Sequence, residues 1–100
     1  MNMQQMMMQA QKMQRELQKA QAELATKEFT ASKAGLVTVT VLGSKEIKSV
    51  VIDEDGFDPE NKEMIEELVV SAINELFEKI DEENEAIQER ITGRSGGFGF

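Results

Sequence analysis

The sequence has 100 residues, of which 40% are hydrophobic, so it predicts a single domain whose core is too small for a deep catalytic cleft. It contains no cysteine and no histidine, which excludes disulfides, thiolate chemistry and acid–base catalysis by histidine. We therefore expect a protein that is not an enzyme. The net charge of −8 is uneven: the first fifty residues hold seven Lys or Arg against four acids, a net +3, and the second fifty hold four against fifteen, a net −11.

An apolar seam runs through the first part of the chain, with successive members three or four residues apart: Met3, Met6, Ala10, Met13, Leu17, Ala20 and Leu24. The residues between them are mostly Gln, Lys, Glu and Ala, which favour helix, so we predict a helix over 3–26. Heptad spacing of this kind is typical of a helix that packs against another helix. We expect Met6, Met13, Leu17 and Leu24 to pack in a dimer interface or in the core.

A basic stripe lies opposite that seam and consists of Lys12, Arg15 and Lys19, again at spacings of three and four. Such a stripe is most often only a solvated helix face, and two nearby acids dilute it. The alternative is contact with phosphate, which a dimer would strengthen by doubling the stripe. We take Lys12, Arg15 and Lys19, with Lys27 and Lys33 beyond them, as candidate DNA-binding residues.

Residues 28–53 change to β-branched and alternating composition, which predicts strands over 28–32, 36–42 and 46–53 in an antiparallel meander. Val39 and Val41 alternate with threonines, so they should lie on the buried face of the sheet. A helix must cover that face.

The covering helix is predicted over 59–91, with Asp58 as its N-cap and Pro59 in its first turn. At about 1.5 Å per residue it would be roughly 50 Å long, whereas a seven-residue strand spans about 23 Å. The helices should therefore overhang the sheet, and a second chain would cover the apolar surface left over. Residues 93–100, rich in Gly and Phe, are predicted to be a flexible tail.

The acidic turn over 53–58 superficially resembles a calcium loop. Placing Gly56 at the sixth loop position puts Val51 at the first, where no ligand is available, so we expect no metal site. No apolar stretch is long enough to span a bilayer, and residues 1–9 have neither the cationic segment nor the continuous apolar run of a signal peptide. We expect a cytoplasmic protein that has neither a membrane partner nor a small-molecule substrate.

The order of these parts resembles a known family. The matching pieces are MQQMMMQAQKMQRELQKAQAEL, GLVTVTVLG, VVID and DPENKEMIEELVVSAINELFEKIDE. They are similar to the YbaB/EbfC family of bacterial nucleoid-associated proteins, over a single domain at residues 1–92. The resemblance implies an α+β fold, an α-β-β-β-α subunit with a three-stranded antiparallel sheet and two long helices, and a tweezer-like homodimer. It also implies binding of duplex DNA without catalysis and without a cofactor. One departure is Leu42-Gly43 at the hairpin, where an Asn-Gly-like turn is common in the family.

The leading hypothesis is a non-enzymatic, nucleoid-associated protein of bacteria. It would bind duplex DNA as a homodimer, mainly through the phosphate backbone, and would organise the nucleoid or regulate genes. The rival hypothesis is a protein-interaction adaptor that recruits a partner through the acidic second helix and the tail.

Overall fold

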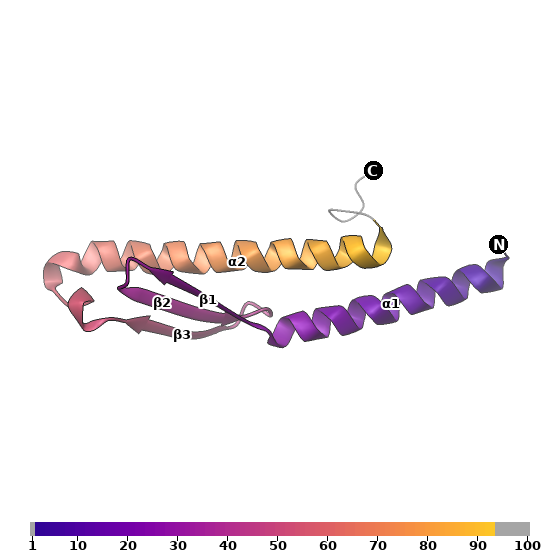
Figure 1. Ribbon diagram of the computed structural model, residues 1–100, viewed down its shortest axis with the longest axis horizontal. Helices are drawn as coiled ribbons and strands as arrows, with labels where there is room; N and C mark the ends of the chain where they lie inside the picture. Colours follow the sequence, from indigo (N-terminus) through magenta and orange to yellow (C-terminus); the bar gives the residue numbers. More distant parts are fainter. Residues whose placement is uncertain (1, 94–100) are drawn as a thin grey trace.

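The structure, a computed structural model, describes residues 2–93 (Figure 1). Along the chain, one helix precedes and another follows a three-stranded sheet, which confirms the α-β-β-β-α order predicted from the sequence. The elements are α1 (Met3–Thr26), β1 (Glu28–Lys33), β2 (Val37–Leu42), β3 (Ile47–Ile52) and α2 (Lys62–Thr92). The prediction for the tail lies outside the described residues, apart from Gly93, which ends α2 in a left-handed conformation.

The sheet is antiparallel, with β2 between β1 and β3. Alternate residues of β2 point toward α2 and form the centre of the core, where Val39 and Val41 are fully buried. Phe29 of β1 pairs with Val41 of β2 and lies on the same face of the sheet. The core therefore sits between α2 and the β1–β2 half of the sheet. Its buried members are Leu24, Phe29, Ala31, Val37, Val39, Val41, Ile65, Ala72, Leu76 and Ile80.

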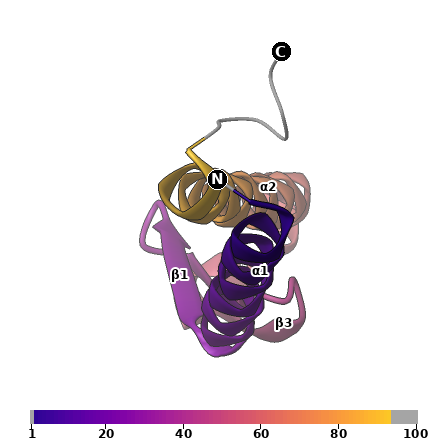
Figure 2. The ribbon, with the colours of Figure 1, turned by 90° about the vertical axis from the view of Figure 1, so that its right-hand side faces the viewer.

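The β3 half of the sheet is covered less well. Helix α2 packs against β1 and β2, and Figure 2 shows it running above the sheet with β1 and β3 on either side. Val50 pairs with Val39, so it faces the same side of the sheet as the core, yet it is 42% exposed. Ile47, opposite Val41, is 47% exposed. An apolar strip of β3 is therefore left open beside α2.

The start of the second helix differs from the prediction. Pro59–Asn61 form a separate 3₁₀ turn, and α2 begins at Lys62 instead of Pro59. The Asp58 side chain accepts a hydrogen bond from the Glu60 amide at 2.9 Å, so it caps this short turn and not the α-helix. Proline still occupies a first helical position, where its missing N–H is not needed.

Helix α1 extends away from the sheet and past the end of α2 (Figure 1). Leu24, near its C-terminal end, is buried, and Met13 and Leu17 are half-buried. Every residue from Asn2 to Lys12 is exposed. We call residues 3–19 the arm and residues 3–11 its tip. The molecule is accordingly elongated, with extents of 68 × 26 × 14 Å.

The contacts of the β2–β3 turn explain why the hairpin has a glycine at position 43. The positive φ of 71° falls on Lys45, so Gly43 is not required for backbone conformation. A Cβ at Gly43 would instead overlap the carbonyl group of Leu24. The Gly43 amide donates to the Lys27 carbonyl at 2.9 Å, and Ser44 donates to Ala25 at 3.1 Å. The glycine thus lets the hairpin hold the C-terminal end of α1.

Candidate nucleic-acid interface

The arm keeps its helical form largely through local interactions. Asn2 and Gln5 form a capping box, in which Asn2 Oδ1 accepts from the Gln5 amide at 2.7 Å and Gln5 Oε1 accepts from the Asn2 amide at 3.4 Å. This satisfies backbone donors at the free end of the helix. The tip can therefore stay helical although nothing else within residues 2–93 packs against it.

Three cations of the arm are free of acidic partners. Lys12, Arg15 and Lys19 are exposed, and within residues 2–93 no carboxylate forms an ion pair with any of them. Their spacing places them on one face of α1, and by helical rise they span about 10 Å. Unpaired, aligned cations on a projecting helix can meet a row of phosphates without first breaking a contact within the chain.

The lysines around the sheet are in a different state, because each is paired with a carboxylate. Lys27 Nζ lies 2.7 Å from Glu83, and Lys33 Nζ lies 2.7 Å from Glu75. Two further pairs complete the set: Lys45 with Asp81 at 2.8 Å and Lys48 with Glu28 at 2.8 Å. DNA would have to displace an acidic side chain to reach any of these four cations.

The Lys33–Glu75 pair also affects ionisation. The hydrogen bond from Lys33, together with its positive charge, lowers the pKa of the Glu75 carboxyl below its ordinary value, and the charge of Lys79 adds to this. A carboxylate held in its charged form by a neighbouring lysine neutralises that lysine at neutral pH. The candidate contact at Lys33 is therefore weaker as a phosphate site than those on the arm.

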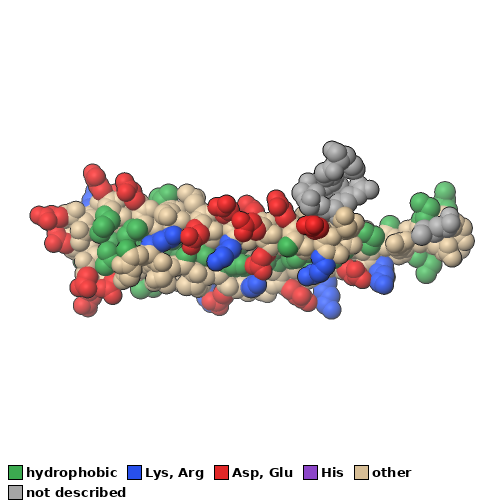
Figure 3. Space-filling model, turned by 45° about the horizontal axis from the view of Figure 1, so that its top comes forward, with side chains coloured by type: hydrophobic (Ala, Val, Ile, Leu, Met, Phe, Trp, Pro, Cys, Tyr) green, Lys and Arg blue, Asp and Glu red, His purple; other side chains and the backbone are tan. Residues whose placement is uncertain are grey.

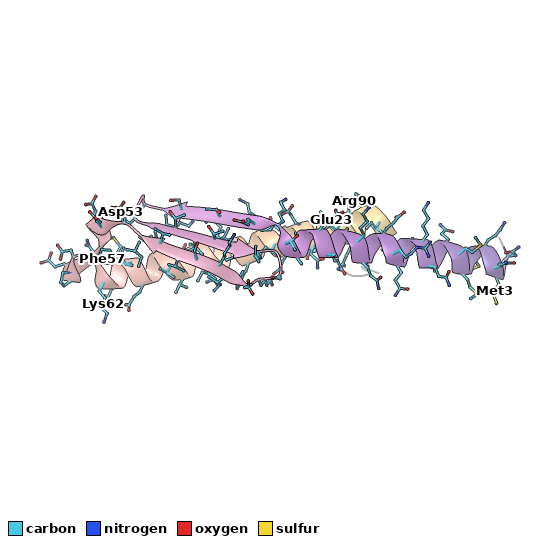
Figure 4. The ribbon with its side chains drawn as sticks, turned by 90° about the horizontal axis from the view of Figure 1, so that it is seen from below. Met3, Glu23, Asp53, Phe57, Lys62 and Arg90 are labelled. Carbon is cyan, nitrogen blue, oxygen red and sulfur yellow. The ribbon has the colours of Figure 1, made fainter. Side chains whose placement is uncertain are left out.

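A groove between the two helices adds one cation that the sequence did not single out. It is lined by Glu16, Lys19, Ala20, Glu23, Arg90 and Ile91. Figure 4 shows Glu23 of α1 and Arg90 of α2 at the place where the helices meet. Arg90 lies in the last turn of α2, where a cation is favourable for the helix dipole, and this was the only sequence signal for it.

Acidic side chains gather on the face of the molecule formed by α2 (Figure 3). They include Glu63, Glu66, Glu67, Glu78, Glu82, Glu85 and Glu89, all of them exposed. The negative charge is thus concentrated over α2, and the arm projects beyond it. This separation allows an acidic protein to offer one positive surface.

The acidic turn before α2 has a structural role. Asp53 Oδ1 accepts from the Asp55 amide at 3.0 Å, in a cap equivalent to that of Asp58. Across residues 2–93, His, Cys, Asp and Glu side chains form no group of three or more that could hold a metal ion. Within the same range, neither helix has a stretch long and apolar enough to cross a bilayer.

The model of the YbaB/EbfC DNA-binding family matches residues 1–95. The chain belongs to this family. A nucleoid-associated protein of Agathobacter rectalis is 46% identical over 96% of this chain and 86% of its own length. One of Enterococcus faecalis is 44% identical over 97% of this chain and 94% of its own.

The fold comparison agrees with this family assignment. A crystal structure of an uncharacterized protein from Helicobacter pylori matches 93% of this chain and 99% of that chain, with a TM-score of 0.77 and 22% sequence identity. At that identity the likeness concerns the fold alone. It supports the same arrangement of helices and sheet that the YbaB/EbfC assignment implies.

In this YbaB/EbfC chain the candidate residues fall into separate regions. The arm holds Lys12, Arg15 and Lys19, whereas Lys27 and Lys33 lie at the two ends of β1 beside α2. Of the packing candidates, Val39, Val41 and Leu24 are in the core, and Met13 and Leu17 are half-buried. Met6 is 56% exposed, so its packing stays a prediction about a second chain.

Proposed function

We propose that this protein binds duplex DNA as a homodimer, without catalysis, through phosphate contacts made mainly by Lys12, Arg15 and Lys19 of the arm. Its role would be nucleoid organisation or gene regulation. The observation that carries the proposal is the set of unpaired cations on a projecting helix in a chain whose net charge is −8. The family description and the names of the relatives support DNA as the partner.

The homodimer is supported by the apolar strip beside α2. Ile47 and Val50 face the core side of the sheet and remain exposed, and Val70 of α2 is 58% exposed. An open edge strand with apolar side chains tends to pair with another chain, and a two-fold axis allows β3 to meet its own copy. The dimer would present two arms to one duplex and double the number of phosphate contacts.

Lys27 and Lys33 are secondary contacts in this proposal. Each would have to exchange a carboxylate for a phosphate oxygen, at Glu83 and Glu75 respectively. Such an exchange replaces one ion pair of the lysine with another, so the number of ion pairs changes little. The salt dependence of DNA binding should therefore be set chiefly by the arm.

The test compares DNA binding of the wild-type chain with that of the triple variant Lys12→Gln, Arg15→Gln, Lys19→Gln, by fluorescence anisotropy with a labelled duplex from about 50 to about 200 mM salt. We expect the slope of log K against log salt to lose about 0.9 for each phosphate contact removed, with weaker binding at every salt concentration.

The matched control removes the same charge elsewhere, in the variant Lys45→Gln, Lys48→Gln, Lys62→Gln. Circular dichroism checks that both variants remain folded. We expect the control to keep most of the salt slope. If the wild-type chain had no affinity for duplex DNA at low salt, the proposal would be refuted. If the arm variant bound DNA as well as the control variant does, the assignment of these three residues would be refuted.

A further inference from the structure

The tip of the arm differs in composition from every other exposed surface of the described chain. From Met3 to Gln11 it contains only Met, Gln and Ala, and all of these residues are exposed. The methionines are exposed to an unusual degree: Met3 by 77%, Met6 by 56%, Met7 by 57% and Met8 by 62%. An uncharged, partly apolar helix end that no other described element covers is a candidate surface for binding a partner.

The tip has two faces with different relations to the rest of α1. Met3 and Met6 continue the apolar seam that packs farther along the helix at Leu17 and Leu24. Gln4, Met8 and Gln11 lie on the opposite face and continue the line of Arg15 at spacings of 4, 3 and 4. We call Gln4, Met8 and Gln11 the polar face of the tip. It extends the cationic stripe toward the free end of the helix.

Charge indicates what the polar face meets. The first acidic residue of the chain is Glu16, so the helix up to that point holds Lys12 and Arg15 and no carboxylate. This end of the helix is positively charged, although the chain as a whole has a net charge of −8. A polyanion held by Lys12 and Arg15 is therefore not repelled by the tip.

Dimensions agree with insertion into a groove. A helix with its side chains is about 10–12 Å across, and the major groove of B-DNA is about 12 Å wide. By helical rise Met8 lies about 10 Å from Arg15, so cations at the rim of the groove would place the polar face over the base pairs. The tip projects beyond the end of α2 and its residues are exposed, so no described element obstructs that approach (Figure 1).

We propose that Gln4, Met8 and Gln11 contact base edges in the major groove and give the protein a preference for A·T base pairs. A glutamine carboxamide can donate to adenine N7 and accept from adenine N6, and an apolar side chain such as Met8 packs against the thymine methyl group. The methionine thioether is flexible enough to fit neighbouring steps. This inference rests on the proposed function, because the arm cations must first hold the duplex.

The experiment measures the affinity of the wild-type chain for three duplexes of equal length: one rich in A·T, one containing only G·C, and the A·T duplex with deoxyuridine in place of thymidine. The wild type should bind the A·T duplex about tenfold more tightly than the G·C duplex. Loss of the thymine methyl groups should weaken binding about threefold.

Two variants of the tip separate the faces. Gln4→Ala, Met8→Ala, Gln11→Ala alters the polar face, and Met3→Ala, Met6→Ala alters the seam face of the same helix end. The polar-face variant should lose the A·T preference and keep the salt slope, whereas the seam-face variant should keep both. Alanine favours helix, so the arm should stay helical, which circular dichroism verifies.

Other results would overturn the inference in distinguishable ways. Equal wild-type affinity for all three duplexes, with steep salt dependence, would reject base contact and leave the proposed function standing. A preference that survives in the polar-face variant would reject these residues. A change of oligomeric state in that variant, measured by light scattering, would assign the polar face to a second copy instead of DNA. Absence of any DNA binding would remove the inference together with the proposed function.

Discussion

Lysines beside the sheet and cations on the arm differ in what surrounds them. Around the sheet each lysine lies within 2.8 Å of a carboxylate, and two of them also lie over aromatic rings, Lys27 at 5.2 Å from the Phe29 centroid and Lys45 at 5.5 Å from that of Phe77. On the arm, Lys12, Arg15 and Lys19 have no such neighbour among residues 2–93.

The difference indicates that the two sets of cations have different roles. Next to the sheet, ion pairs join α2 to β1 and to the β2–β3 turn and so help to position the helix that covers the core. On the arm, the cations are left available to a partner. Exposed ion pairs each contribute little to stability, so the main effect of pairing is to neutralise the four lysines in the body of the molecule, by which we mean the sheet and α2.

The largest difference between the body and the arm should appear in the free energy of unfolding, when a side chain in the core of the body is shortened. Leu76 of α2 is 1% exposed and belongs to the core between this helix and the sheet. The substitution Leu76→Ala should lower the free energy of unfolding by about 2–5 kcal/mol, because it removes buried methyl groups and leaves a cavity. Urea denaturation followed by circular dichroism measures this change.

The matched substitution on the arm is Met6→Ala, at a residue that is 56% exposed. If no second chain covers Met6, the substitution should change the free energy of unfolding by no more than about 0.5 kcal/mol, since little packing is lost within one chain. A destabilisation by Met6→Ala comparable to that by Leu76→Ala would mean that a second chain buries the seam face of the tip.

A somewhat smaller effect should distinguish the two faces of β3. Val50 points to the open strip beside α2, whereas Val51 pairs with Thr38 on the opposite face and is 58% exposed. In the proposed dimer, Val50→Asp would bury an unpaired charge and should raise the dissociation constant about 100-fold, near 2.7 kcal/mol.

The neighbouring substitution Val51→Asp should leave the dimer nearly unchanged, because that face is already open to solvent. Sedimentation equilibrium across a range of protein concentrations measures both constants. If Val50→Asp and Val51→Asp dimerise equally well, the strip formed by Ile47, Val50 and Val70 is not the interface between copies.

The sequence was sufficient to predict the elements whose signals are local. The seam from Met3 to Leu24 has helical spacing, and the alternation around Val39 and Val41 has strand spacing, so both elements and their order could be read directly. The exact start of α2 at Lys62 could not, because Asp58 and Pro59 carry signals that suit a 3₁₀ turn as well as an α-helix.

The state of the candidate cations was harder to predict, because it depends on contacts between distant residues. Within a helix, Glu23 would be the natural partner of Lys27, but Lys27 ends α1 and pairs with Glu83, which is 56 positions away. Lys33 pairs with Glu75, which is 42 positions away. Only the packing of α2 on the sheet reveals that these two lysines are neutralised and that Lys12, Arg15 and Lys19 are not.

The smallest predicted effect concerns the pH dependence of one pair. Because Lys33 lowers the folded-state pKa of Glu75, the pair stabilises the fold at pH values above the ordinary carboxyl pKa of about 4.3, and this contribution is lost as pH falls through the lowered value. Glu75→Gln should therefore shift the urea midpoint slightly downward at neutral pH and not at about pH 3. Glu67→Gln, at an exposed carboxylate with no ion pair among residues 2–93, is the control. A Glu75→Gln effect of equal size at both pH values would show that the side chain acts through packing, and the contrast between paired lysines in the body and unpaired cations on the arm would then rest on the remaining three pairs.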